Sequence, residues 1–246
     1  MALAIFDLDN TLLAGDSDYL WGQYLVDQGI VDQAQYEEAN ARFYDDYKAG
    51  TLNIDAFLKF ALKPLSEHPR AQLEQWRSEF IDSLIRPILL PAAREVIATH
   101  KSLGHTLMII TATNAFVTAP IAALYGIDHL IATLPEISDD RYTGNYLGTA
   151  CFQEGKVERL NAWLKETGAS LEGSWFYSDS HNDLPLLKMV ETAIAVDPDE
   201  TLHAYANQTA WPIITLRDDS DLEDQLKRIK KLNVDRSTIL NPSVIR

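Results

Sequence analysis

Leu3-Ala-Ile-Phe6, followed at once by Asp7-Leu-Asp9-Asn-Thr11, is the stretch that decides the fold class of this 246-residue chain. A short apolar run that ends at an acid is typical of a strand buried on both faces, as in a parallel sheet. In a doubly wound sheet, ligands bind beyond the carboxyl ends of the strands, where we expect Asp7 and Asp9 to lie. Two carboxylates there are costly unless a cation or a shared proton offsets their charge. The pair therefore indicates a hard cation such as Mg²⁺.

From residue 91 onward, helical patterns alternate with short apolar runs. The predicted helices cover residues 91–103, 117–125, 156–167, 184–190 and 200–210. The predicted strands cover residues 106–111, 129–132, 174–178, 193–196 and 213–216. A β-hairpin is predicted over 135–148, with turn residues at Asp139-Asp140 and at Thr143-Gly144. Strands that alternate with helices imply a parallel sheet covered on both faces.

Residues 15–87 have a different character. They are polar and rich in Tyr, Gln, Glu and Ala, with apolar residues such as Leu20 and Tyr24 at helical spacing. Pro64 and Pro69 are expected to interrupt the helical pattern. The predicted fold class is α/β, with a doubly wound parallel-sheet core formed by residues 1–14 and 88–246. An all-helical insert at 15–87 follows the first strand, so we expect it to lie above the ligand crevice.

Composition narrows the choice of partners. The formal net charge is −15 and the pI is about 4.7, so the surface repels nucleic-acid backbones and anionic membranes. Cys151 is the only cysteine, which rules out a disulfide within the chain and suits a reducing compartment. We expect a cytoplasmic protein that binds a small-molecule substrate and neither nucleic acid nor membrane. The sequence leaves the oligomeric state open.

Further polar residues stand where a predicted strand ends or a helix begins. Thr111 offers a hydroxyl just ahead of a helix, where N–H groups can hold a phosphate. Lys156 is a compact positive charge suited to a phosphoryl oxygen. Asp179 and Asp183 could complete a metal site with the first acidic pair. Each has a plain structural explanation as a helix cap, a solvated lysine or a turn acid. Their common position around one crevice favours a shared site.

Together these motifs resemble those of the haloacid dehalogenase superfamily of phosphatases. The helical insert after the first strand is similar to the cap of its phosphoserine-phosphatase-like branch, and the resemblance covers nearly the whole chain. The motif residues are Asp7, Asp9, Thr11, Thr111, Lys156, Asp179 and Asp183. One departure is Ser178, which stands where the family often has a glycine.

The resemblance implies a Rossmannoid core and a phosphoric monoester hydrolase that works through a covalent intermediate. By this resemblance, Asp7 attacks phosphorus and becomes an aspartyl-phosphate. Asp9 is the general acid for the leaving group and then the base for water. Lys156 and Thr111 bind the oxygens of the phosphoryl group.

The resemblance also implies a magnesium site. Asp7, the backbone carbonyl of Asp9, and Asp179 would hold the ion, with Asp183 supporting them. Mg²⁺ is therefore the predicted cofactor.

The helical insert is expected to select the substrate. In the phosphoserine-like branch an acid nine residues after the nucleophile holds the substrate amine. Here that position is Asp16, with Asp18 nearby, although Asp16 could also serve only as a helix N-cap. Arg42 is a candidate for holding a substrate carboxylate. The full predicted substrate-binding set is Asp16, Asp18, Arg42, Thr111, Ala112, Asn114, Lys156 and Asn182. The expected substrate is a small amine-bearing phosphomonoester, with histidinol phosphate slightly favoured over phosphoserine.

Two other functions are compatible with this kind of fold. One is a signalling domain of the receiver type that is phosphorylated on aspartate. That class has no acid two residues after its phosphorylated aspartate and no helical insert, so Asp9 and residues 15–87 argue against it. The other is a catalytically silent binding module, which usually lacks a motif carboxylate. All of the motif carboxylates are present here.

Overall fold

The computed structural model describes residues 2–218, 222–223, 226–227 and 231, so the end of the predicted core range lies outside the described residues. Within them, one sheet of six parallel strands has the order β3-β2-β1-β6-β7-β8. Its strands are β1 Leu3–Phe6, β2 Thr106–Ile110, β3 His129–Ile131, β6 Trp175–Ser178, β7 Thr192–Val196 and β8 Ile213–Ile214. Strand β1 lies between β2 and β6, where the strand order reverses. The residues after β1 therefore stand at the switch point of the sheet, the usual place for a ligand.

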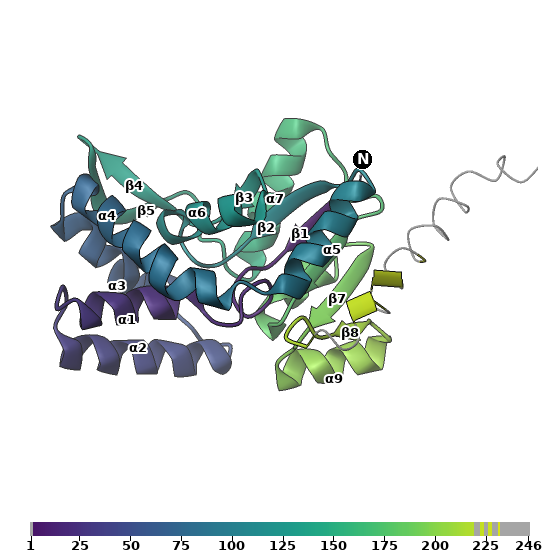
Figure 1. Ribbon diagram of the computed structural model, residues 1–246, viewed down its shortest axis with the longest axis horizontal. Coiled ribbons are helices and arrows are strands. Elements are labelled where there is room, and N and C mark those ends of the chain that lie inside the picture. The colour runs from purple at the N-terminus through teal and green to yellow at the C-terminus, as the bar shows by residue number, and fades with distance from the viewer. Residues whose placement is uncertain (1, 219–221, 224–225, 228–230, 232–246) are drawn as a thin grey trace, which may run out of the picture.

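Helices cover both faces of this sheet (Figure 1). They are α5 Pro91–Ser102, α6 Ala115–Tyr125, α7 Glu154–Thr167, α8 Leu184–Leu187 and α9 Glu200–Thr209. Because successive strand residues point to opposite faces, Phe6 packs in the cluster that includes α5 and α6, whereas Ile5 packs with α7, α8 and α9. This arrangement confirms the predicted doubly wound α/β fold. None of the described helices is both long enough and apolar enough to cross a membrane.

The segment between β1 and α5 is helical, as predicted. Its helices are α1 Ser17–Asp27, α2 Gln33–Lys48, α3 Ile54–Glu67 and α4 Arg70–Phe80, followed by the π-helical turn η1 Ile81–Ile85 and the 3₁₀ turn η2 Arg86–Ile88. We call α1–α4 the helical insert. Figure 1 shows it gathered on one side of the molecule, away from β7 and α9. Trp21 of α1 lies edge-on to Phe80 of α4 and to Phe116 of α6, so the insert shares an aromatic core with the sheet domain.

The hairpin was predicted correctly except for one of its turns. Strands β4 Leu134–Ser138 and β5 Arg141–Leu147 pair antiparallel, and Asp139 and Asp140 form the turn with φ of 49° and 60°. Thr143-Gly144 is not a second turn, because both residues lie inside β5. Gly144 has φ of 83°, and a Cβ there would lie 3.2 Å from Ser66 Oγ of α3. Glycine is therefore used here to bring the hairpin against the insert.

Several other boundaries differ from the prediction. Pro64 does not interrupt α3. It stands in the last turn of the helix, so the backbone N–H that proline lacks costs only a hydrogen bond near the helix end. Helix α6 begins two residues earlier than predicted, since Asn114 is its N-cap and accepts from the N–H of Phe116. Helix α7 likewise begins at Glu154. Helix α8 ends at Leu187, shorter than the predicted 184–190.

Candidate active site

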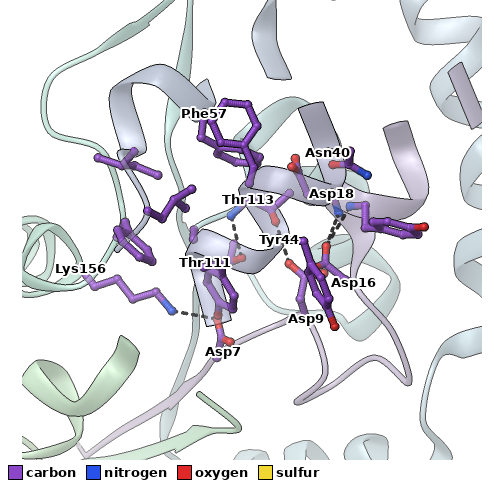
Figure 2. Close-up of a pocket in the computed structure, with 17 residues that line it drawn as sticks. Asp7, Asp9, Asp16, Asp18, Asn40, Tyr44, Phe57, Thr111, Thr113 and Lys156 are labelled. Atoms are coloured by element: carbon purple, nitrogen blue, oxygen red, sulfur yellow. Dashed lines mark hydrogen bonds and ion pairs between the residues drawn. The ribbon is translucent and has the colours of Figure 1, made fainter. Parts of the chain in front are cut away.

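Asp7 is the first residue after β1 and lines a pocket between the sheet and the helical insert (Figure 2). Its N–H donates to the carbonyl of Tyr177 at 2.9 Å, which extends the β1–β6 pairing by one residue. Lys156 of α7 places Nζ 3.0 Å from Asp7 Oδ1 and 2.6 Å from Asp183 Oδ1. All three side chains are buried. The lysine is thus fixed between two carboxylates at the floor of the pocket.

The charges at this floor do not balance. Burial raises the pKa of Asp7 to about 7; Lys156 lowers it, and Asp183 and Asp9 raise it. Burial opposes the charged form of Lys156, but Asp183 and Asp7 outweigh it and raise the pKa of the lysine well above its ordinary value. Lys156 is therefore cationic, and one lysine faces several carboxylates.

Asp9 lies at the junction of the sheet and the insert. Its Oδ1 accepts from the N–H of Ser17, the first residue of α1, at 2.6 Å, and its Oδ2 accepts from Thr113 Oγ1 at 2.8 Å. Burial and the nearby Asp16 carboxylate raise its pKa to about 6, against the opposing hydrogen bonds from Ser17 and Thr113. A carboxyl group with a raised pKa in a fixed orientation is suited to donate a proton near neutral pH.

The loop after β2 forms another wall of the pocket. Thr111, Ala112 and Thr113 all line it, as Figure 2 shows for the two labelled threonines. Thr111 Oγ1 accepts from the N–H of Thr113 at 3.2 Å, so its hydroxyl proton remains available. Asn114 does not line the pocket. Its side-chain oxygen caps α6, which accounts for its presence without a role in substrate binding.

Asp179 and Asp183 follow β6. Asp179 Oδ1 accepts from Thr11 Oγ1 at 3.1 Å, and Asp183 Oδ2 accepts from Ser178 Oγ at 2.7 Å. Burial raises the pKa of Asp179 well above its ordinary value, and repulsion from Asp7 and Asp183 adds to the effect. These acids are near enough to repel one another, which is the electrostatic condition that a bound cation relieves.

The donor set suits a hard cation, with one restriction. Among the described residues, no three His, Cys, Asp or Glu side chains form a metal-binding group by themselves. A site at this place therefore needs an oxygen donor that is not a side chain, such as the backbone carbonyl of Asp9 named in the sequence analysis. Asp183 already bonds Lys156 and Ser178, a position that fits support rather than direct ligation. With that carbonyl, the oxygen-only set matches what Mg²⁺ binds in proteins.

Two further acids enter the pocket from the helical insert. Asp16 is the N-cap of α1, and its Oδ1 accepts from the N–H groups of Asp18 and Tyr19 at 3.0 and 2.9 Å. Figure 2 shows Asp16 and Asp18 beside Asp9. Burial raises the pKa of Asp18 well above its ordinary value, and Asp16 and Asp9 raise it further. Asp16 thus caps the helix and also lines the pocket, and its role toward a substrate amine stays a prediction.

Arg42 and Asn182 do not line this pocket. The guanidinium of Arg42 lies 4.9 Å from the ring centre of Phe43, on α2. Asn182 is buried and accepts from Gln153 Nε2 at 2.8 Å while donating to the carbonyl of Tyr47 at 3.3 Å. Its contacts join α2 to the loop after β6. Among the residues that line the pocket, Lys156 is the only cation.

A model of the haloacid dehalogenase-like hydrolases matches residues 4–188, which is most of the chain and includes all of the residues around Asp7 just described. The chain belongs to this hydrolase family. It is 46% identical to a histidinol-phosphatase of Neisseria meningitidis over 87% of this chain and 99% of that protein. It is 30% identical to the phosphoserine phosphatase SerB1 of Mycobacterium tuberculosis over 88% of this chain and 71% of that one.

Solved structures share the fold of this chain. A Bordetella pertussis protein of unknown function matches with a TM-score of 0.83 and 43% identity, over 87% of this chain and 98% of that one. A substrate-bound phosphoserine phosphatase matches with a TM-score of 0.67 and 22% identity, over 92% and 97% of the two chains, which supports the fold alone. The family and its relatives confirm the predicted enzyme class, a phosphoric monoester hydrolase.

Several residues in or beside the pocket were not predicted from the sequence. Thr113 donates to Asp9, and its place two residues after Thr111 was the available signal. Tyr47 lines the pocket from α2, and its hydroxyl donates to Ser180 Oγ, at 3.0 Å. Asn40 also lines the pocket from α2. Tyr47 and Asn40 sit in an ordinary helical pattern, so nothing in the sequence alone distinguished them from surface or packing residues.

Proposed function

We propose that this phosphatase hydrolyses a small amine-bearing phosphomonoester with the help of Mg²⁺, through an aspartyl-phosphate on Asp7. Histidinol phosphate is the favoured substrate and phosphoserine the next. The observation that carries the proposal is that one pocket joins Asp7, Asp9 and Lys156 from the sheet domain with Asp16 and Asp18 from the helical insert.

The charges of the pocket favour an amine over a carboxylate. Lys156 is its only cationic lining residue, and both Asp7 and Asp183 already bond it. A substrate carboxylate would therefore meet Asp16 and Asp18 without a free cation to pair with. An amine would find two acids whose raised pKa values fall when a positive charge arrives. This supports histidinol phosphate, which lacks a carboxylate, over phosphoserine, and the 46% identical histidinol-phosphatase supports the same choice.

The roles of the protein groups follow from their positions. Asp7 is the nucleophile, held toward the pocket by the strand it extends. Asp9 protonates the leaving alkoxide and then removes a proton from water, with Thr113 and Ser17 fixing its orientation. Lys156 and Thr111 bind phosphoryl oxygens and stabilise the charge that gathers there during transfer.

A magnesium ion would be held by Asp7, the carbonyl of Asp9, and Asp179, with Asp183 in support. Once bound, it would neutralise the clustered carboxylates and withdraw charge from the phosphoryl group. Removal of the ion should restore the repulsion among Asp7, Asp179 and Asp183 and keep an anionic phosphate away.

We further propose that the helical insert, within residues 15–87, acts as a cap domain on a core of residues 1–14 and 88–246. Asp16 at the N-cap and Asp18 in the first turn of α1 line the pocket, which supports a role in selecting the substrate. The cytoplasmic localisation and the absence of nucleic-acid partners stay predictions from composition.

Steady-state kinetics with and without metal test this function. In Mg²⁺ we expect kcat/KM for histidinol phosphate to exceed that for phosphoserine by at least about tenfold, a free-energy difference of about 1.4 kcal/mol. Chelation should abolish turnover of both, and added Mg²⁺ should restore it. Undiminished turnover after exhaustive chelation would refute the metal assignment, and a preference for phosphoserine would refute the substrate choice.

A further inference from the structure

A second cavity of about 580 Å³ lies between α1 and α2, next to the active-site pocket. We call it the interhelix cavity. It shares Asp16, Tyr19, Asn40 and Tyr44 with the active-site pocket, so the two hollows meet at a common wall. Figure 2 shows Asp16, Asn40 and Tyr44 together on the side of the pocket away from Lys156. A molecule bound at Asp7 could extend past this wall without crossing the sheet domain.

The facing rows of the two helices carry polar side chains beside Val26, Tyr36 and Ala41, where packed helices normally carry mainly apolar ones. Tyr19 and Gln23 line the cavity from α1, and Glu37, Asn40 and Tyr44 line it from α2. Their spacings of four, three and four residues place each set on one side of its helix. The sequence therefore keeps a hollow here rather than a packed seam. The two helices touch elsewhere, since a Cβ on Gly22 would lie 2.5 Å from the ring of Tyr36.

Several polar groups of this hollow have no partner among the described residues. The amide of Asn40 and the hydroxyls of Tyr19 and Tyr44 make no hydrogen bond to a described residue, and the two tyrosine rings are tilted by 51° with their centres 6.4 Å apart. The charged lining residues are Asp16 and Glu37; the Lys48 ammonium lies 4.2 Å from the ring centre of Tyr44, but no described lining residue is itself a cation. The cavity therefore repels anions and offers hydrogen-bond acceptors to a neutral or positively charged group.

We infer that the interhelix cavity is a subsite for the end of the substrate distal to the phosphate, and that it takes a second nitrogen-bearing group. This inference rests on the proposed phosphatase function and extends it. The amine nearest the phosphate lies by Asp16 and Asp18, while a longer substrate reaches Asn40 and Glu37. Substrates with two nitrogen groups are then preferred over those that end at the first amine.

The test compares a blocked cavity with a matched control on the same helix. Ala41 lines only the interhelix cavity, and Ala41→Trp fills it with a large side chain. Glu38 is exposed on α2 and lines neither cavity, so Glu38→Trp adds the same bulk elsewhere. Three phosphate esters serve as probes. Histidinol phosphate has two basic nitrogen groups, O-phosphoethanolamine has one, and p-nitrophenyl phosphate has none.

We expect Ala41→Trp to lower kcat/KM for histidinol phosphate at least tenfold, mainly through KM. The other two probes should change less than twofold, and Glu38→Trp should leave all three within twofold. Equal losses on all three probes, or no loss on any, would overturn the inference while leaving the phosphatase function intact. Wild-type enzyme that hydrolyses none of the probes in Mg²⁺ would instead refute the function itself.

A second variant tests the same inference if Ala41→Trp fails to fold. Glu37→Gln keeps the size of a side chain that lines only the interhelix cavity and removes its charge. We expect a loss of two- to tenfold for histidinol phosphate and no change for O-phosphoethanolamine. An unchanged selectivity ratio in a folded Glu37→Gln protein would contradict the subsite.

Discussion

The floor of the active-site pocket and the wall supplied by the helical insert are built on different principles. On the floor, Lys156 bonds two carboxylates, and Asp9 has a donor on each oxygen. On the insert wall, the side chain of Asn40 has no hydrogen bond to another described residue, and no cation among the described residues pairs with Asp18. Groups whose partners belong to the protein are fixed in advance for chemistry. Groups without partners are free to meet a substrate, which suggests that the floor determines the reaction and the insert determines what reacts.

The largest effect should come from the floor. Asp7→Asn removes the nucleophile while nearly preserving its shape, and we expect kcat to fall at least a hundredfold, about 3 kcal/mol of barrier. Asp139→Asn changes an exposed turn acid at a φ that asparagine tolerates, and it should leave kcat unchanged. Near-normal turnover by folded Asp7→Asn, measured with an aryl phosphate and with histidinol phosphate, would refute a covalent mechanism.

Asp9 should matter most for poor leaving groups. An alkoxide needs a proton as it departs, whereas p-nitrophenolate needs little help. We expect Asp9→Asn to slow the first step with histidinol phosphate by about a hundredfold or more, and to slow it less with p-nitrophenyl phosphate. Single-turnover rates measure this difference. An identical loss on both esters would remove the general-acid role.

Asp16 and Asp18 line the pocket on the insert side, and their variants test whether the insert selects the substrate. Asp16→Asn retains the helix cap, since asparagine caps well, but loses the charge. We expect Asp16→Asn and Asp18→Asn each to cost about 1.5–3 kcal/mol in kcat/KM for amine-bearing substrates, and almost nothing for p-nitrophenyl phosphate. If kcat/KM for p-nitrophenyl phosphate fell as much as kcat/KM for the amine-bearing substrates, the two acids would stabilise the fold rather than select the substrate.

His100 lies far from the insert and packs beneath the strands that carry the floor of the pocket. It is fully buried, and its Nε2 shares a 2.7 Å hydrogen bond with the hydroxyl of Tyr177, on the strand that pairs with β1. Burial, with a contribution from His105, lowers its pKa from 6.5 to about 3. The unfolded chain therefore binds this proton first, so acidification below about pH 6.5 favours unfolding.

At pH 5.5 this residue alone should lower the free energy of unfolding by roughly 1 kcal/mol relative to neutral pH. His100→Gln does not titrate, so it should remove that part of the pH dependence while wild type keeps it. Denaturant titrations at several pH values measure both slopes. Parallel slopes in the two proteins would show that His100 is not the group responsible.

The smallest effect should come from the link between the two regions. Tyr47→Phe removes the hydroxyl that donates to Ser180 Oγ but keeps the ring against Phe152. We expect a loss of about 1 kcal/mol in kcat/KM, the usual worth of one hydrogen bond. Ser180→Ala should lose a similar amount, and the double variant little more than either. Strictly additive losses would show that the two side chains act separately.

The floor was far easier to predict from the sequence than the insert wall. Asp7, Thr111 and Asp179 each follow an apolar strand, and parallel strands bring their carboxyl ends to one edge whatever the connections between them. The fold class followed from the same alternation. Asn40 and Tyr47 lie on helices whose relative placement depends on side-chain packing across the insert. Periodicity alone could not show which side of α2 would face the pocket, and Arg42, chosen for its charge, does not line it.

The covalent role of Asp7 is the central claim, and trapping the phospho-enzyme tests it directly. Asp9→Asn should let p-nitrophenyl phosphate transfer its phosphoryl group, because that leaving group needs no acid, while the hydrolysis step lacks its base. Mass spectrometry of rapidly quenched Asp9→Asn protein should then show one added phosphoryl group on the peptide that contains Asp7. The double variant with Asp7→Asn should show none. A phosphoryl group on any other residue, or no adduct while p-nitrophenolate is released in a burst, would contradict the account.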